Sequence, residues 1–126
     1  MRQSTEIVKR FLDAWGASKG YRNAIREFFT EDCVYENVGL SLTTGPSESI
    51  DFLDGFAQQL GFASLMVDMR AITASGNVVM TERVDHLFDG TGRRLATLRV
   101  MGVFELRGDR ICGWRDYFDP AALNPS

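Results

Sequence analysis

The sequence predicts an α+β fold in which N-terminal helices pack on a strongly curved, mixed or antiparallel sheet that forms a cone with an internal pocket. The apolar residues recur with a helical period up to Gly61 and with a strand period of two after it. The connections in the second half, "SGN", "DGTG" and "RGD", are short and carry glycine, as β-hairpins require. The 126 residues suffice for one domain with a real core, and we expect residues 1–126 to form it.

Three helices are expected before Gly61, because apolar residues there are spaced three and four apart. The first runs from a cap at Ser4 or Thr5 to about Ala17, and a shorter one covers about residues 22–29. The third begins in "TTGPSES", where Pro46 fits the first turn because its missing N–H would have no partner there. A short strand, "EDCVYENV", lies between the second and third helices.

Four strands are expected after Gly61, at about residues 65–74, 78–88, 93–106 and 110–118. Strands this close in sequence pair antiparallel as a meander. Helices that cover one face of such a sheet leave a pocket between the two layers.

The composition excludes several classes of function. The apolar share of 44% and the charged share of 25% are ordinary for a globular protein, and the net charge of −3 provides no basic surface for nucleic acid. The N-terminal "MRQSTEIVKRFLD" holds no apolar run of signal-peptide or membrane-spanning length, so we expect a cytoplasmic protein with no membrane partner. One histidine and two separate cysteines, Cys33 and Cys112, predict reduced thiols and no metal site.

The alternation within the later strands brings charged residues to an inward face. Arg83 and Asp85 are two residues apart in "MTERVDHLF" and therefore share a face. Asp116 has Trp114 and Phe118 beside it on its own face, so it needs a partner, and Arg83 is the natural one. One arginine cannot neutralise two buried carboxylates, so one of them is expected to hold a proton, which gives an acid and a base. From the residues alone, a surface ion pair, a turn aspartate and a carboxylate site all stay open.

Four motifs extend this pattern: Y-x-N at Tyr35 and Asn37, T-E-R-V-D at residues 81–85, G-V-F-E-L at 102–106 and G-W-R-D-Y-F-D at 113–119. Their order and spacing closely resemble limonene-1,2-epoxide hydrolases, small enzymes with the nuclear-transport-factor-2-like, or SnoaL-like, cone fold. The resemblance runs from about Phe11 to Asp119. It implies that water adds in one step to a small lipophilic epoxide, terpene-like or cyclic, to give a vicinal diol without a cofactor.

The resemblance also implies a role for five residues. Asp116 resembles the general base that takes a proton from the attacking water, and Tyr35 and Asn37 resemble the groups that hold this water. Asp85 resembles the general acid that protonates the epoxide oxygen. Arg83 resembles the bridge that holds and tunes both carboxylates.

The same comparison, together with strand alternation, predicts the pocket walls and an interface. The walls that would bind the substrate are Val67, Leu87, Leu98, Val100, Trp114 and Phe118. The outer face of the sheet is expected to form a homodimer, as in the family, through Val84, His86, Phe88, Met101 and Val103.

Two other functions remain open from the sequence. One is a ketosteroid-isomerase-like or polyketide-cyclase-like enzyme with an isolated aspartate base, and the other is a non-catalytic small-molecule-binding module of the same fold. The first does not need the Arg83 bridge with its second aspartate, and the second does not explain five polar positions that face inward. An α/β-hydrolase is excluded because the chain has no G-x-S-x-G motif.

Overall fold

The computed structural model describes residues 3–123, so residues 1–2 and 124–126 of the expected domain lie outside the described residues. The helices are α1 (Ser4–Asp13), α2 (Tyr21–Phe28) and α3 (Gly45–Leu60), with 3₁₀ turns η1 (Ala14–Gly16) and η2 (Pro120–Leu123). The strands are β1 (Phe29–Asn37), β2 (Ser41–Thr44), β3 (Phe62–Ser75), β4 (Val78–Asp89), β5 (Arg94–Arg107) and β6 (Arg110–Tyr117). In the described part of the chain, no helix is long and apolar enough to span a membrane.

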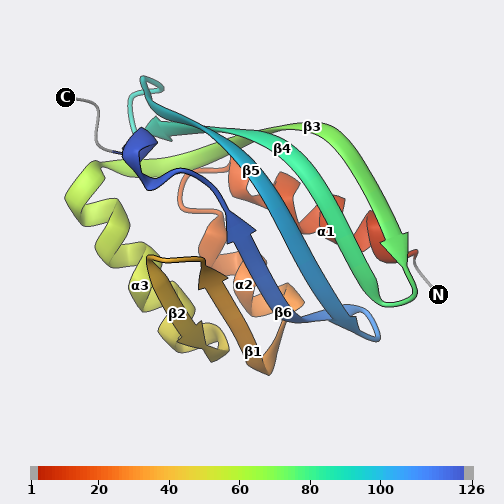
Figure 1. Cartoon of the computed structure of the whole chain (residues 1–126). Helices are drawn as coiled ribbons and strands as arrows, with labels where there is room; N and C mark the ends of the chain where they lie inside the picture. Colours follow the sequence, from red (N-terminus) through yellow and green to blue (C-terminus); the bar gives the residue numbers. More distant parts are fainter. Residues whose placement is uncertain (1–2, 124–126) are drawn as a thin grey trace.

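The strands form one mixed sheet in the order β2-β1-β6-β5-β4-β3. Strands β3 to β6 pair antiparallel as the predicted meander, whereas β1 runs parallel to β6 and antiparallel to β2. The three helices lie on one side of this sheet (Figure 1). The predicted α+β class and the mixed sheet are confirmed, but the sheet is not strongly curled, so the strongly curved cone is not what the structure has (Figure 1).

The residues that were expected to begin and end α3 do so in the structure. Gly61 ends α3 in the left-handed conformation, with φ of 79°, and its N–H donates to the Ala57 carbonyl oxygen. Pro46 lies in the first turn of that helix, and the Glu48 carboxylate accepts a hydrogen bond from the Thr44 N–H at 3.1 Å. Strand β2 was not predicted, because "SLTT" is too short and too polar to show a strand pattern without its partner β1.

The core between helices and sheet contains a cluster of aromatic rings, and Trp114 is at the centre of this cluster. Its indole ring is stacked between Tyr35 at 4.3 Å and Phe104 at 5.1 Å, measured between ring centroids. Phe11 of α1 and Trp15 of η1 meet the same ring edge-on, at 5.2 and 5.7 Å. This packing fixes the direction of the indole N–H, which points to the candidate site described next. Cys33 and Cys112 are free thiols, as predicted.

Candidate active site

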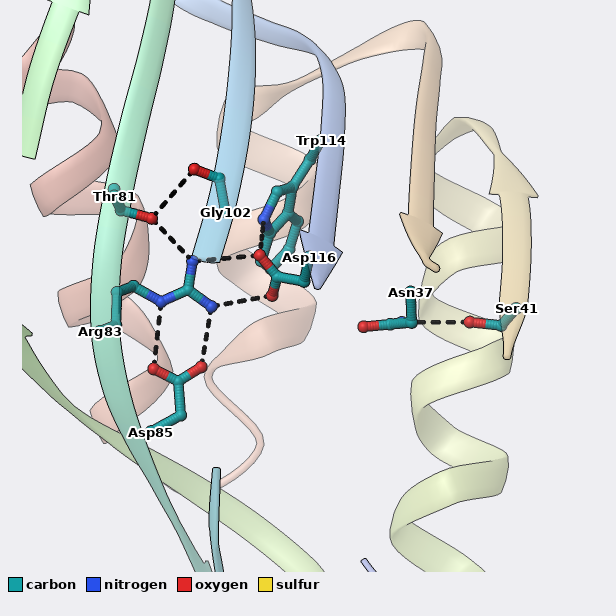
Figure 2. A network of polar contacts seen from close by, with 8 residues as sticks. All are labelled: Asn37, Ser41, Thr81, Arg83, Asp85, Gly102, Trp114 and Asp116. Atoms are coloured by element: carbon teal, nitrogen blue, oxygen red, sulfur yellow. Dashed lines mark hydrogen bonds and ion pairs between the residues drawn. The ribbon is translucent and has the colours of Figure 1, made fainter. Parts of the chain in front are cut away.

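The site is built around Arg83, whose side chain is 0% exposed and belongs to β4, the strand next to the edge strand β3. Its Nε and Nη2 atoms donate to the two oxygens of Asp85, at 3.1 and 2.8 Å. Its Nη1 and Nη2 atoms donate to the two oxygens of Asp116 in β6, at 3.1 and 2.8 Å (Figure 2). The guanidinium therefore holds two carboxyl groups in paired geometry, one from its own strand and one from two strands away. The sequence-predicted triad of Asp85, Arg83 and Asp116 is assembled as expected.

The fifth N–H of Arg83 points to Thr81, whose hydroxyl oxygen accepts it at 3.2 Å. The Thr81 hydroxyl in turn donates to the carbonyl oxygen of Gly102 in β5, at 3.2 Å. All five N–H groups of the buried guanidinium therefore have acceptors. The sequence placed Thr81 on the same face as Arg83 but gave it no role.

Burial and charge act in opposite directions on the ionisation of the triad. Burial raises the pKa of Asp116 above its ordinary value, the charge and hydrogen bonds of Arg83 oppose that rise, and the charge of Asp85 adds to it. The Trp114 indole N–H donates to Asp116 Oδ1 at 2.7 Å, a contact that the sequence reasoning missed, since it expected Trp114 only as a wall. Burial alone would lower the pKa of Arg83, but the charges of Asp116 and Asp85 raise it above the ordinary value, so the guanidinium stays cationic.

Tyr35 and Asn37 reach the same site because β1 runs parallel to β6. The register pairs Tyr35 with Trp114 and Asn37 with Asp116. Burial first, and then the charge of Asp116, raises the pKa of Tyr35 well above its ordinary value, so the hydroxyl stays protonated and can donate. The Asn37 Nδ2 atom donates to the Ser41 hydroxyl at 3.1 Å, and Figure 2 shows the amide oxygen directed toward the side where Asp116 lies.

A cavity of about 270 Å³ opens beside these groups. Four of the five predicted catalytic residues line it, while Arg83 lies behind the carboxyl groups and does not. Five of the six predicted walls line it as well: Leu87, Leu98, Val100, Trp114 and Phe118. Val67 does not lie with them, because it borders a separate hollow next to Leu12 and Phe88.

Further residues line the cavity that the sequence reasoning did not assign to it. They come from α3, from β3, from the β1–β2 turn and from the turns η1 and η2, and they are Phe52, Leu53, Phe56, Gln59, Phe62, Leu65, Leu40, Trp15 and Leu123. The apolar face of α3 was visible in the sequence, but nothing in the sequence indicated that this helix lies across from Asp85 and Asp116.

The arrangement predicts how stability responds to loss of the bridge. In Arg83→Met, two buried carboxyl groups lose their cation, so we expect the free energy of unfolding at pH 7 to fall by about 3–5 kcal/mol. The pKa of Asp116 in this folded variant would lie above that in the unfolded chain. Stability would therefore return as the pH falls through the folded pKa toward the unfolded one, and it would be lost as the pH rises back through the folded pKa. Urea denaturation at pH 5 and pH 7 measures both effects.

The control is Arg107→Met, which removes an exposed ion pair with Asp32 and is expected to change the free energy of unfolding little at either pH. An Arg83→Met loss of the same size at pH 5 and pH 7 would contradict the assignment of that loss to unpaired carboxylates.

Comparison with known proteins agrees with this geometry. Residues 2–124 match the limonene-1,2-epoxide hydrolase catalytic domain. Over 89 residues, 71% of this chain, the sequence is 42% identical to epoxide hydrolase EphG of Mycobacterium tuberculosis, and the match spans 56% of that protein's length. The solved structure of an LEH-like epoxide hydrolase from M. tuberculosis has a TM-score of 0.76 at 33% identity, covering 95% of this chain and 85% of that one.

A more distant structure shows how widely the fold is shared. An NTF2-like (nuclear-transport-factor-2-like) protein of unknown function from Burkholderia pseudomallei has a TM-score of 0.77 at 17% identity, covering 99% of this chain and 100% of that one. This likeness shows the fold alone. The family follows instead from the match over almost the whole chain and from the closer relatives: the chain belongs to the limonene-1,2-epoxide hydrolase family and has an NTF2-like fold.

Proposed function

We propose that this protein is an epoxide hydrolase that adds water in one step to a small lipophilic epoxide and releases a vicinal diol. The observation that carries the proposal is the position of two carboxyl groups, Asp85 and Asp116, on one buried guanidinium, with both lining the same apolar cavity. An epoxide oxygen is a poor leaving group until it is protonated, and water is a poor nucleophile until it is partly deprotonated. A paired acid and base meet both needs in one step.

Asp116 is the proposed general base. Its Oδ1 atom accepts hydrogen bonds from Trp114 and Arg83, whereas Oδ2 accepts only one, from Arg83, so Oδ2 keeps more capacity for a water proton. The raised pKa of this buried carboxyl makes it a stronger base than an exposed aspartate. The Tyr35 hydroxyl would donate to the water oxygen and the Asn37 amide oxygen would accept its second proton, which leaves a lone pair directed at the epoxide.

Asp85 is the proposed general acid, which donates its proton to the epoxide oxygen while water attacks the ring carbon. Afterwards Asp116 holds the water proton and Asp85 has lost its own, so the proton must return to Asp85 before the next turnover. The Nη2 atom of Arg83 donates to both carboxyl groups and so links the two groups between which this proton moves. This mechanism requires one proton between the two carboxyl groups in the resting enzyme.

The cavity favours a small substrate. About 270 Å³ suits a cyclic or terpene-like epoxide, and the aliphatic and aromatic walls favour a lipophilic ring over a charged one. An isomerase or cyclase with an isolated aspartate base would have no use for the second carboxyl group on Arg83.

The catalytic roles predict the outcome of two isosteric changes. In Asp116→Asn and in Asp85→Asn, the carboxyl group can no longer accept or donate the proton, so we expect kcat for diol formation to fall about 10²–10⁴-fold. The test substrates are limonene-1,2-epoxide and cyclohexene oxide, with diol measured by chromatography and folding checked by circular dichroism.

The matched control is Asp119→Asn, three residues further along the chain. Asp119 is exposed and its carboxylate accepts a hydrogen bond from the Ala121 N–H, so this variant should keep its turnover. A folded Asp116→Asn protein that turns over at the wild-type rate would rule out Asp116 as the base.

We also propose a homodimer formed through the outer face of the sheet. Large apolar side chains are exposed there, with Met66 at 60%, Met80 at 50%, Met101 at 53% and Tyr117 at 45% exposure. Val84, His86 and Val103 lie half-buried on the same face. Phe88, where the register between β4 and β5 shifts by one residue, borders the hollow next to Leu12.

Sedimentation velocity tests this interface. The wild-type protein should sediment as a dimer, and Met101→Glu should sediment as a monomer because it places a charge in the apolar contact. A monomeric wild-type protein would exclude the proposed interface.

A further inference from the structure

We propose that Thr81 and Gly102 are positioning residues, which hold the Arg83 guanidinium in the one place where it can pair with both carboxyl groups. Neither residue lines the cavity, so both would act through Arg83 and Asp116 and not on the substrate. The catalytic consequence rests on the proposed function, whereas the effect on the triad does not.

The three strands bring these residues into one row. In the sheet register, Gly102 of β5 is opposite Thr81 of β4 on one side and opposite Asp116 of β6 on the other. Thr81 is 1% exposed, so its hydroxyl has no access to bulk water and depends on protein partners. Because the hydroxyl donates its only proton to the Gly102 carbonyl oxygen, its lone pairs are left to face Arg83 Nη1 (Figure 2).

The Nη1 atom is the part of Arg83 that this contact controls. It has two N–H groups, one directed to Thr81 at 3.2 Å and one to Asp116 Oδ1 at 3.1 Å. If the Thr81 acceptor is lost, one buried N–H is left without a partner, which is costly in a site that excludes water. The guanidinium would then turn to recover a hydrogen bond, and the paired contact with Asp116 would weaken.

Gly102 provides the space in which this contact forms. A Cβ atom at residue 102 would lie 2.4 Å from Arg83 Nη1, 2.5 Å from Asp116 Oδ1 and 2.9 Å from Thr81 Oγ1. Real Cβ atoms do not approach polar atoms so closely, so any side chain would push Arg83 and Asp116 apart. The glycine is therefore required for space between the strands and not for a left-handed backbone, since its φ is not positive.

The charged and titratable groups that face Asp116 determine how its pKa would change if its contact with Arg83 weakened. Arg83 and Asp85 face it from β4 and Tyr35 faces it from β1, while Gly102 of β5 contributes no side chain. A weaker contact with Arg83 leaves burial and the charge of Asp85 less opposed, so the pKa of Asp116 would rise. Because Asp116 must be ionised to act as a base, the acid limb of the activity profile would move to higher pH.

Thr81→Val and Thr81→Ser separate the hydroxyl from the shape of the residue. Thr81→Val keeps the shape and removes the hydrogen-bond acceptor. We expect kcat to fall roughly ten- to hundredfold, the size of effect seen when the hydrogen-bond partner of a metal ligand is removed, with KM nearly unchanged. Thr81→Ser keeps the hydroxyl and should retain kcat within about threefold. Gly102→Ala should lose turnover as Thr81→Val does, and Thr73→Val, at an exposed position in β3, is the control expected to match wild type.

A carbon-13 NMR titration of the Asp116 carboxyl gives a readout that does not need turnover. We expect its midpoint to move to higher pH in Thr81→Val and to stay at the wild-type value in Thr81→Ser and Thr73→Val. If the wild-type protein forms no diol, the proposed function fails, and this titration alone decides the positioning role. An unmoved midpoint in folded Thr81→Val would overturn the proposal, as would a loss of kcat equally large in Thr81→Ser.

Discussion

The burial of one positive charge is the constraint on which the rest of this structure depends. The Arg83 guanidinium lies out of contact with water, and removing such a charge from water costs several kcal/mol unless every donor finds a partner. All five N–H groups do, four of them on Asp85 and Asp116 and the fifth on Thr81. Two carboxylates around one cation leave a net negative charge in the core, and a single shared proton removes it. In the proposed mechanism, this proton makes Asp85 the acid and leaves Asp116 as the base.

The sheet and the helices supply what this triad cannot provide alone. The parallel pairing of β1 with β6 brings Tyr35 and Asn37 next to Asp116, and the aromatic stack of Tyr35, Trp114 and Phe104 fixes the indole N–H that bonds its Oδ1 atom. On the other side, α3 adds apolar side chains to the cavity. A fold shared with distant proteins thus carries a site whose chemistry comes from a few inward-facing residues.

The sequence predicted well which face of a strand a side chain lies on, because that follows from the period of two. It predicted poorly which distant segments of the chain contact one another. Strand alternation placed Arg83, Asp85 and Asp116 on inward faces correctly, because side chains in a strand alternate strictly. It could not distinguish Val67 from Leu98 as a cavity wall, since both face inward and only the position of α1 and α3 separates them. Strand β2, and with it the contact between Ser41 and Asn37, was missed because four residues with a single apolar side chain among them carry no pattern of their own. The predicted strong curvature failed because alternation specifies faces but not how far a sheet curls.

The most direct test of the acid–base assignment is a single turnover in ¹⁸O-labelled water, with enzyme in excess over limonene-1,2-epoxide or cyclohexene oxide and the diol analysed by mass spectrometry. If Asp116 activates water for direct attack, the diol from the first turnover carries ¹⁸O. If a carboxylate attacks the epoxide and the ester is then hydrolysed at its carbonyl carbon, the first diol carries ¹⁶O from the protein, and the acid–base assignment is wrong.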